Sequence, residues 1–430
     1  MHLHPRSIRG RLALPSAVLA LLACGGGSGT NLGGGGGGPG GGTGGGPGGG
    51  TTINGVVLDA YRQPLAGRTV LVGGQSKTTD STGAFSASVT TPYDVVILEP
   101  APAKVATVFS QLTRTDPKLY DFGASGSATR SATLGGHLVG GDPLPTPSGE
   151  LTGVSWGSAE TSTGSYVTGS PYTFPVAWSG PSTSSGSVHA LQWTVDDNGT
   201  VSGYVAHGVT TGVSLTSAGT TGNADVMLSA VLSDHVTATV HPPAGHALVA
   251  RAMFVTFSDQ AYFPVSSDGL DTADIDLPVP SGIGASAIVN ATATDGSSQT
   301  MAQVSGIQPG TTGVSITLPA PALSTAPADG ATGVDTSTDL VWTPVAGGVH
   351  VLLLGAGAAD PTYVLVSGGT HVRIPDLSAQ GLALPSGRLY DFGLVAVGPY
   401  ATLDDFAATG TIPREGFGFL TVSATQFTTR

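Results

Sequence analysis

Short segments in which apolar and polar residues alternate recur along the chain after residue 50, separated by Gly, Pro, Asn or Asp. A period of two is typical of β-strands that have one buried face. Charged residues make up only 10% of the chain, whereas surface helices normally carry many Glu, Lys and Arg residues. We therefore predict an all-β chain of tandem β-sandwich domains.

The chain beyond residue 50 is long enough for three or four domains of ordinary size. Turn signals and shifts in composition predict a signal peptide at 1–23, a tether at 24–50, and β-rich units at 51–123, 124–229, 230–320 and 321–430. Whether 124–320 is one domain or two stays open. The Pro- and Ala-rich stretch 318–329 separates the last two units.

The N-terminal segment has the pattern of an export signal. Arg6, Arg9 and Arg11 precede the apolar run 12–23, and no acidic residue is present up to Ala23. This run is shorter than the roughly 20 residues that a membrane-spanning helix needs. We therefore expect the segment to direct export and then to be removed.

The only cysteine, Cys24, stands where cleavage of that signal is expected, after Leu-Leu-Ala at 21–23. This arrangement resembles the lipobox of bacterial lipoproteins, in which the cysteine is lipidated and becomes the first mature residue. The alternative is an ordinary secretory signal with a chance cysteine, but a lone thiol has no disulfide partner within an exported chain. The resemblance implies a membrane-anchored lipoprotein of the cell envelope, at the outer membrane, with the periplasmic or surface face left open.

A glycine-rich tract follows the cysteine. Residues 25–50 contain 19 glycines, and such a segment has no side chains to bury and the most backbone entropy to lose. We expect a disordered tether with an end-to-end distance of roughly 28 Å. Matches to G-x-G-x-x-G inside it follow from composition, because no strand precedes them and no helix follows, so they indicate no nucleotide cofactor.

Net charge limits the possible partners. Loss of the signal leaves 12 basic and 28 acidic residues, a net charge of −16. Such a chain repels nucleic acid and anionic lipid head groups. We expect no nucleic-acid partner, attachment to the membrane through the lipid on Cys24, and contact with a glycan or with an envelope or extracellular protein.

The first β-rich unit carries a series of spaced motifs that resembles the carboxypeptidase regulatory-like domains. The motifs are Gly55-x-Val57-x-Asp59, Pro64-Leu65-x-Gly67 and Thr79-Asp80-x-x-Gly83-x-Phe85. The resemblance implies a seven-stranded sandwich of the transthyretin type and a non-catalytic accessory role.

The last unit resembles fibronectin type III and related immunoglobulin-like modules. Leu340-x-Trp342-x-Pro344 is similar to their B strand, and residues 384–396 are similar to the E–F corner and strand F. The resemblance implies that Trp342 lies in the core and that the hydroxyl of Tyr390 bonds back to the backbone. Residues 398–415 depart from the pattern as an insertion before the last strand, and long loops often carry binding sites.

Turn residues and aromatic residues organise the middle of the chain. Asp197-Asn198-Gly199 predicts a tight hairpin, and Asp295-Gly296 predicts another. Trp178 and Trp193 are interpreted as core anchors, with a sugar-stacking platform as the alternative.

The sequence contains one match to a catalytic motif. Residues 153–157 (Gly-Val-Ser-Trp-Gly) fit G-x-S-x-G, the nucleophile elbow of α/β-hydrolases, with Ser155 as the nucleophile. That chemistry requires a helix directly after the serine, but residues 158–165 are mostly Ser, Thr and Gly. We attribute the match to composition and expect a non-catalytic protein.

Metal binding has two weak candidates. His235 and His241 share a face if they lie on one strand, but their Cβ atoms are then roughly 20 Å apart. His207 and His246 lie nearby in the sequence and are interpreted as turn or surface residues. The densest acidic cluster could supply calcium ligands, but its spacing does not match an EF-hand and a solvated acidic loop is the alternative. Its members are Asp268, Asp271, Asp274 and Asp276.

These patterns predict a lipid-anchored envelope protein that presents β-sandwich modules for binding or structural contacts, with carbohydrate or protein as the partner. The competing class is a hydrolase of envelope polymers in which the β-modules are accessories. An all-β structure without a helix after Ser155 would remove the support for that class.

Overall fold

The computed structural model describes residues 50–59, 62–99, 102–123, 130–268, 273–409 and 416–430. Cys24 and Asp271 lie outside the described residues. Strands dominate, and the helical elements of the described ranges are the 3₁₀ turn η1 (Ser378–Gln380) and the α-helix α2 (Leu403–Thr409). The predicted all-β sandwich class is confirmed. Across these ranges, no helix has the length and apolarity that a membrane crossing requires.

The first sandwich contains the seven strands described between residues 51 and 120. Its sheets have the strand orders β4-β1-β7 and β3-β2-β5-β6. Alternation in β1 turns Ile53 and Val57 into the core, where they meet Phe85 of β4. The strands are β1 (Thr51–Leu58), β2 (Thr69–Val72), β3 (Gln75–Thr78), β4 (Ala84–Val89), β5 (Tyr93–Leu98), β6 (Val105–Leu112) and β7 (Lys118–Tyr120).

The second sandwich packs the sheet β11-β10-β13-β14-β16-β9 against the sheet β12-β8-β15. Trp156 and Trp178 are fully buried in its core. Its strands are β8 (Arg130–Gly136), β9 (Leu138–Gly140), β10 (Glu150–Ser158), β11 (Ser162–Tyr166), β12 (Tyr172–Trp178), β13 (Thr183–Val195), β14 (Val201–Thr216), β15 (Thr220–Thr221) and β16 (Val226–Ala230).

The third sandwich packs the sheet β20-β17-β23 against β19-β18-β21-β22. Strict alternation in β21 buries Ala287, Val289, Ala291 and Ala293 on one face. Its strands are β17 (Leu232–His241), β18 (Ala247–Thr256), β19 (Tyr262–Asp268), β20 (Asp274–Ser281), β21 (Ser286–Thr294), β22 (Ser298–Ile307) and β23 (Val314–Thr317).

The fourth sandwich packs β24-β26-β29 against β28-β27-β30-β31, and β25 adds to β31. Its strands are β24 (Ser324–Ala326), β25 (Ala331–Val334), β26 (Asp339–Trp342), β27 (Val349–Gly355), β28 (Thr362–Ser367), β29 (His371–Arg373), β30 (Leu389–Gly398) and β31 (Gly416–Thr429). Residues 403–409 of the predicted insertion form α2, whose Leu403 and Phe406 join the core shared with the first sandwich.

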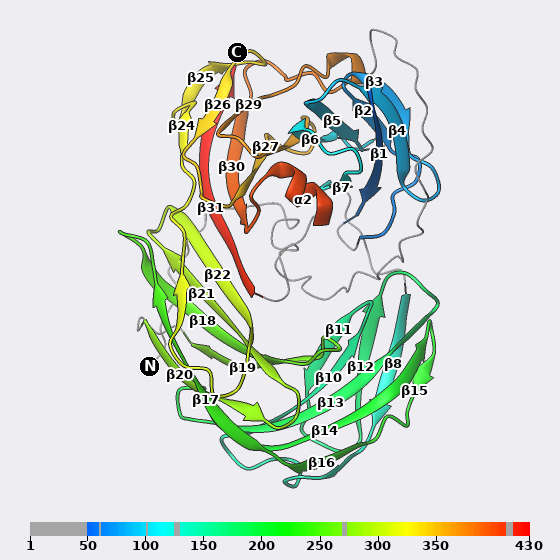
Figure 1. Cartoon of the computed structure of the whole chain (residues 1–430), viewed down its shortest axis with the longest axis vertical. Helices are drawn as coiled ribbons and strands as arrows, with labels where there is room; N and C mark the ends of the chain where they lie inside the picture. Colours follow the sequence, from blue (N-terminus) through cyan, green and yellow to red (C-terminus); the bar gives the residue numbers. More distant parts are fainter. Residues whose placement is uncertain (1–49, 60–61, 100–101, 124–129, 269–272, 410–415) are drawn as a thin grey trace, which may run out of the picture.

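One continuous sheet joins three of the four sandwiches. The parallel pairing of β28 with β6 connects the fourth sandwich to the first, and the antiparallel pairing of β22 with β31 connects it to the third. With β25 attached to β31, the result is a 13-stranded sheet whose main path runs from β19 to β3. Figure 1 shows the first and fourth sandwiches side by side at the top and the third and second side by side at the bottom. Strand pairing therefore joins the first, third and fourth sandwiches into one body, and the second contacts the third where β14 meets β17 and β20.

Two hairpins and two aromatic side chains were predicted at specific positions. Asp196 to Thr200 closes the predicted β13–β14 hairpin with Gly199 at φ 81°, and Gly296 at φ 90° closes the β21–β22 hairpin. Trp193 is buried at the contact with the third sandwich, so it is an anchor and not an exposed sugar platform. The Tyr390 hydroxyl bonds to the backbone, as predicted, and donates to the carbonyl of Pro361, 3.0 Å away.

Candidate functional site

The G-x-S-x-G motif lies in the middle of β10, and its residues divide between the two faces of the strand. Val154 and Trp156 point into the core of the second sandwich. Gly153, Ser155 and Gly157 occupy the opposite face, because successive side chains alternate along a strand. The motif therefore presents one hydroxyl with a glycine, which has no side chain, on each side of it.

This face of β10 receives residues 259–263 of the third sandwich, the end of the β18–β19 turn and the start of β19. A Cβ on Gly157 would lie 2.3 Å from the amide nitrogen of Ala261, and a Cβ on Gly153 would lie 2.9 Å from the Phe263 ring. Between them, the Tyr262 amide donates a hydrogen bond of 3.1 Å to Ser155 Oγ. We call this contact the seam; both glycines are required because backbone and ring approach them directly.

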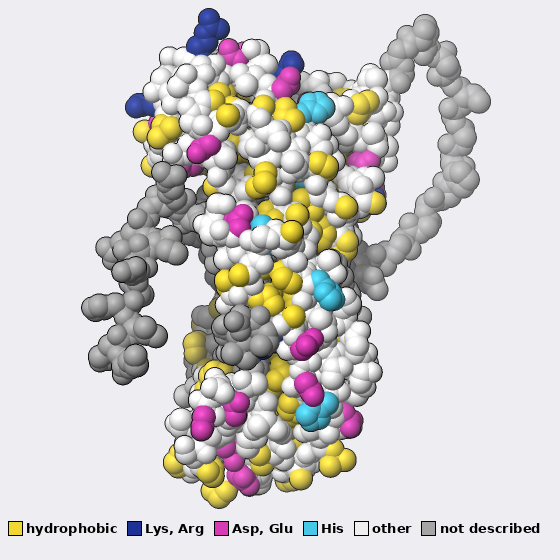
Figure 2. Space-filling view, turned by 90° about the vertical axis from the view of Figure 1, so that its left-hand side faces the viewer, with side chains coloured by type: hydrophobic (Ala, Val, Ile, Leu, Met, Phe, Trp, Pro, Cys, Tyr) yellow, Lys and Arg dark blue, Asp and Glu magenta, His cyan; other side chains and the backbone are white. Residues whose placement is uncertain are grey.

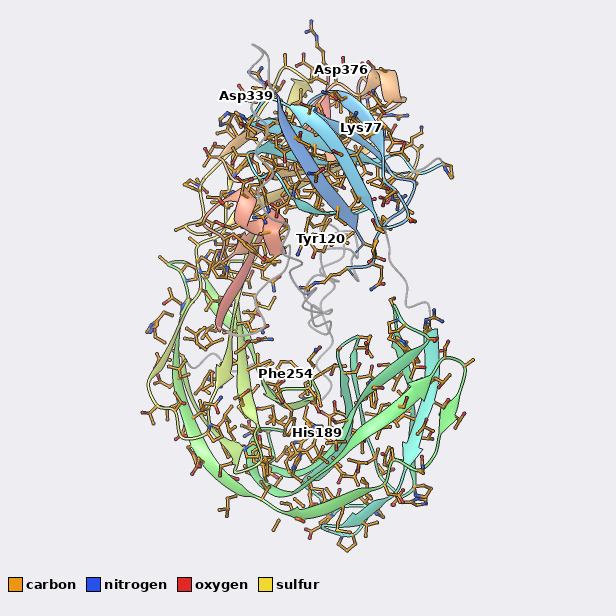
Figure 3. The ribbon with its side chains drawn as sticks, turned by 45° about the vertical axis from the view of Figure 1, so that its right-hand side comes forward. Lys77, Tyr120, His189, Phe254, Asp339 and Asp376 are labelled. Atoms are coloured by element: carbon orange, nitrogen blue, oxygen red, sulfur yellow. The ribbon has the colours of Figure 1, made fainter. Side chains whose placement is uncertain are left out.

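Three titratable side chains form a chain at the seam. His189 of β13 lies with its Nε2 atom 2.8 Å from Asp259 Oδ2, and its Nδ1 atom is 3.2 Å from Nε2 of His207 on β14. Phe257 packs on both imidazoles, with ring centroids 4.1 Å from His189 and 5.0 Å from His207. Figure 3 shows His189 where the second and third sandwiches meet.

Burial controls the electrostatics of this chain. The exposed fractions of His189 and His207 are 6% and 8%. Burial and the neighbouring His189 lower the pKa of His207 to about 4, although Asp259 opposes the shift. Burial by itself raises the pKa of Asp259, but hydrogen bonds from His189, Ser187 and the Ala261 amide hold that pKa below its ordinary value.

The serine of the motif does not have the surroundings of a nucleophile. Ser155 is opposite His189 in the register of β10 and β13, but its hydroxyl bonds to the carbonyl of Thr163, 3.5 Å away, and to the Tyr262 amide. Its exposed fraction is 0%, and the antiparallel strand β11 follows where an elbow requires a helix. The hydrolase interpretation of this motif therefore loses its structural support.

Three of the four acidic residues predicted as weak calcium ligands lie on two strands of the third sandwich. Asp268 ends β19, and its backbone pairs with Arg251 of β18. On β20, Asp274 accepts a hydrogen bond of 3.0 Å from Thr239, and Asp276 pairs at 2.7 Å with the predicted surface residue His235. Among the described side chains, no three His, Cys, Asp or Glu residues converge as metal ligands. Because Asp271 lies outside those residues, the calcium cluster stays a prediction.

A cleft of about 290 Å³ brings this acidic strand together with the predicted β13–β14 hairpin. The buried guanidinium of Arg251 borders it and donates a hydrogen bond of 2.7 Å to the carbonyl of Asp274. The backbone hydrogen bond from Thr200 holds the pKa of Asp196, at the hairpin, below its ordinary value. The polar lining residues are Asp196, Asn198, Thr200, Arg251, Ser266, Asp274 and Asp276. This lining suits a hydroxyl-rich ligand, since carboxylate, amide and hydroxyl groups all form hydrogen bonds.

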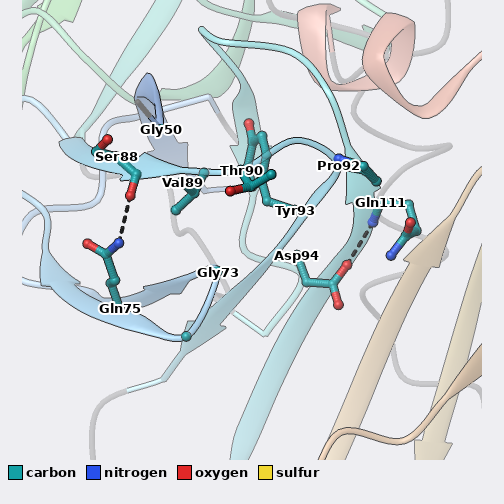
Figure 4. A pocket seen from close by; sticks show the side chains of 11 residues that line it. Gly50, Gly73, Gln75, Ser88, Val89, Thr90, Pro92, Tyr93, Asp94 and Gln111 are labelled. Carbon is teal, nitrogen blue, oxygen red and sulfur yellow. Dashed lines mark hydrogen bonds between the residues drawn. The ribbon is translucent and has the colours of Figure 1, made fainter. Parts of the chain in front are cut away.

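A larger hollow of about 580 Å³ lies at the end of the first sandwich, beside Gly50 (Figure 4). Asp94 accepts a hydrogen bond of 2.8 Å from the amide of Gln111, and Gln75 donates one of 2.6 Å to the carbonyl of Ser88. Gln111 has a φ of 66°, next to the bulge between β5 and β6. The hollow is lined by Gly50, Gly73, Gly74, Gln75, Ser88, Val89, Thr90, Pro92, Tyr93, Asp94 and Gln111.

Charge is distributed unevenly over the surface. On the face shown in Figure 2, lysine and arginine side chains gather at the upper end, whereas carboxylates are spread along the length of the molecule. This distribution agrees with the excess of acidic residues in the sequence.

His189 and Asp259 were not predicted as site residues from the sequence. His207 was predicted to be a turn or surface residue, and this prediction was wrong, because His207 is buried within β14. The available signal was the position of His189 and His207 on the two strands of the predicted hairpin. Asp259 is 70 residues from His189, and the sequence offered no sign of their contact.

No protein-family model and no curated protein matches the sequence. Among solved structures, the Bacillus anthracis TIE protein is 10% identical, with 63% of this chain and 50% of that chain covered and a TM-score of 0.15. BcpA, the major pilin subunit of Bacillus cereus, is 8% identical over 62% of this chain and 99% of its own, with a TM-score of 0.13. The Corynebacterium diphtheriae major pilin SpaA is 11% identical over 62% and 99%, with a TM-score of 0.14. The match thus spans half the length of the TIE protein, and likenesses this low carry no argument about function.

Proposed function

We propose that this protein is a lipid-anchored component of the cell envelope that presents a joined body of four β-sandwiches for binding or structural contacts. Cys24 carries the anchor, residues 25–50 give reach, and the sandwiches make the contacts. The supporting observation is the 13-stranded sheet, which joins the fourth sandwich to the first and the third. Strand pairing in this sheet, together with the seam between the second and third sandwiches, holds the surfaces of the body in fixed relation, as a presenting scaffold requires.

The anchor is tested by membrane fractionation of Cys24→Ala, with Ser28→Ala in the same tether as the matched control. We expect Cys24→Ala to leave the membrane fraction and Ser28→Ala to stay in it. Protease treatment of intact cells then distinguishes a surface location from a periplasmic one. Membrane association of Cys24→Ala equal to that of the control would disprove lipid anchoring.

The carbohydrate version of this proposal places the ligand in the cleft between the β13–β14 hairpin and β20, because that cleft combines carboxylate, amide and hydroxyl groups. Titration of the purified chain with envelope polysaccharide fragments tests it. Asp276→Ala should weaken binding at least tenfold, whereas Asp335→Ala, on the fourth sandwich, should leave it unchanged. Equal binding by both variants would exclude the cleft as the glycan site and leave protein contact as the role.

A further inference from the structure

The seam between the second and third sandwiches contains a chain of three titratable groups from three different segments. Asp259 comes from the turn after β18, His189 from β13 and His207 from β14. The groups that face His207 electrostatically are His189 and Asp259. Phe257 packs against both imidazoles, and it lies two residues before the start of the segment that docks on β10.

The hydrogen-bond pattern assigns the protons. The carboxylate of Asp259 accepts a hydrogen bond, so His189 Nε2 carries a hydrogen and donates it. His189 Nδ1 is then the acceptor for the Nε2 hydrogen of His207. In this neutral arrangement each imidazole carries one hydrogen, and every bond of the chain is satisfied.

Added protons affect this chain in two unequal steps. With one extra proton on the pair, one imidazole still donates to the other, so the hydrogen bond between them persists. With two extra protons, His189 Nδ1 and His207 Nε2 both carry a hydrogen, and these hydrogens face each other across the 3.2 Å between the two nitrogens. Two donors cannot form a hydrogen bond, and two cations then repel each other in a buried site.

We propose that Asp259, His189 and His207 form a pH-operated latch, which closes the seam when the imidazole pair holds at most one extra proton and releases it when both imidazoles are cationic. Release displaces Phe257 and loosens residues 259–263 from Gly153, Ser155 and Gly157. Burial lowers the pKa of His207 to about 4, so the latch stays closed at neutral pH and responds only to strong acidification. This inference goes beyond the proposed anchoring and does not depend on it.

Hydrogen exchange of the full chain, followed by mass spectrometry between pH 7 and pH 3 and corrected for intrinsic exchange, tests the latch. The probe is the peptide containing the Tyr262 amide, which bonds to Ser155 Oγ. We expect its protection to fall at least tenfold below pH 4, while peptides from β21 keep theirs. Unchanged protection of the Tyr262 peptide down to pH 3 would overturn the proposal.

Two variants separate a titrating latch from simple packing. His207→Gln keeps an amide donor for His189 without a titratable ring, so the acid response should disappear; an acid response equal to that of the wild type would overturn the proposal. Asp259→Asn keeps an acceptor but removes the negative charge that favours imidazolium, so release should move to lower pH; opening at every pH would indicate packing alone.

His350→Gln, in the fourth sandwich, is the control and should keep the wild-type response. If His207→Gln fails to fold, the direction of the Asp259→Asn shift decides the question.

Discussion

Ser155 and His189 lie opposite each other on adjacent strands, yet the serine hydroxyl bonds to backbone groups of Thr163 and Tyr262. A motif that suggests catalysis in the sequence serves here as a docking surface between sandwiches. The same alternation that buries Val154 and Trp156 turns the two glycines and the serine outward. The spacing of the motif therefore follows from strand geometry.

Gly157→Ala should weaken the seam. The added Cβ would lie 2.3 Å from the Ala261 nitrogen and 2.6 Å from the Asp259 carbonyl oxygen, and neither backbone atom can move without shifting the turn. We expect a loss of about 1–3 kcal/mol in the free energy of unfolding, measured by urea denaturation. Gly164→Ala on the neighbouring strand is the matched control, because its nearest atom is at 3.4 Å. Equal stability of the two variants would show that β10 and the turn at Asp259 to Ala261 can move apart without a loss of stability.

Acidification should destabilise the fourth sandwich through His350. Burial lowers the pKa of this imidazole to about 4, below the value of 6.5 expected in the unfolded chain. The unfolded state therefore binds the proton more readily, so the stabilisation is complete above pH 6.5 and is lost as the pH falls toward 4. The full shift corresponds to about 3 kcal/mol.

Urea unfolding of wild type and His350→Gln at pH 7.5 and pH 4.5 measures this contribution. His207 titrates in both proteins, so the difference between them isolates His350. The wild type should lose more stability on acidification than the variant. Equal losses would mean that His350 takes up no proton on unfolding.

The class of the fold was predictable because alternation is a local property. β21 shows why, since every second residue from Ala287 to Ala293 is buried. The hairpin at Asp197-Asn198-Gly199 was predictable for the same reason, because Gly199 supplies the positive φ that the turn requires. These features depend only on residues close together in the sequence.

The joining of the sandwiches was not predictable from local patterns. β6 and β28 pair although Val105 and Thr362 are more than 250 residues apart, and a buried central strand has the same apolar pattern whichever strand lies beside it. The contact of Asp259 with His189 also joins residues that are far apart in the sequence, so local patterns could not predict it. A single polar residue in a turn gives no indication of a partner in another sandwich.

Asp404 should matter for the contact between the first and fourth sandwiches. This residue of α2 accepts hydrogen bonds of 3.0 Å from the amides of Thr113 and Arg114, and a further one from the Thr113 hydroxyl. Hydrogen bonds to a charged group contribute more than neutral ones, so Asp404→Ala should cost about 1–3 kcal/mol. Faster exchange of the Thr113 and Arg114 amides would identify the cause.

Asp376→Ala is the control for Asp404, because Asp376 accepts its 3.0 Å hydrogen bond from Ser378 within its own loop. It should leave the exchange of the Thr113 and Arg114 amides unchanged. A similar increase in both variants would show that the effect is general destabilisation.

Removal of the fourth sandwich should expose two apolar sheet edges. In a chain of residues 50–320, β6 loses its partner β28 and β22 loses its partner β31. Unpaired apolar edges template further strand pairing, and β6 buries most of its residues in the complete protein. We expect this truncated chain to elute as large aggregates in size-exclusion chromatography with light scattering, and co-expression of residues 321–430 to reduce them. A monodisperse truncated chain would mean that the first three sandwiches form a stable body without the shared sheet.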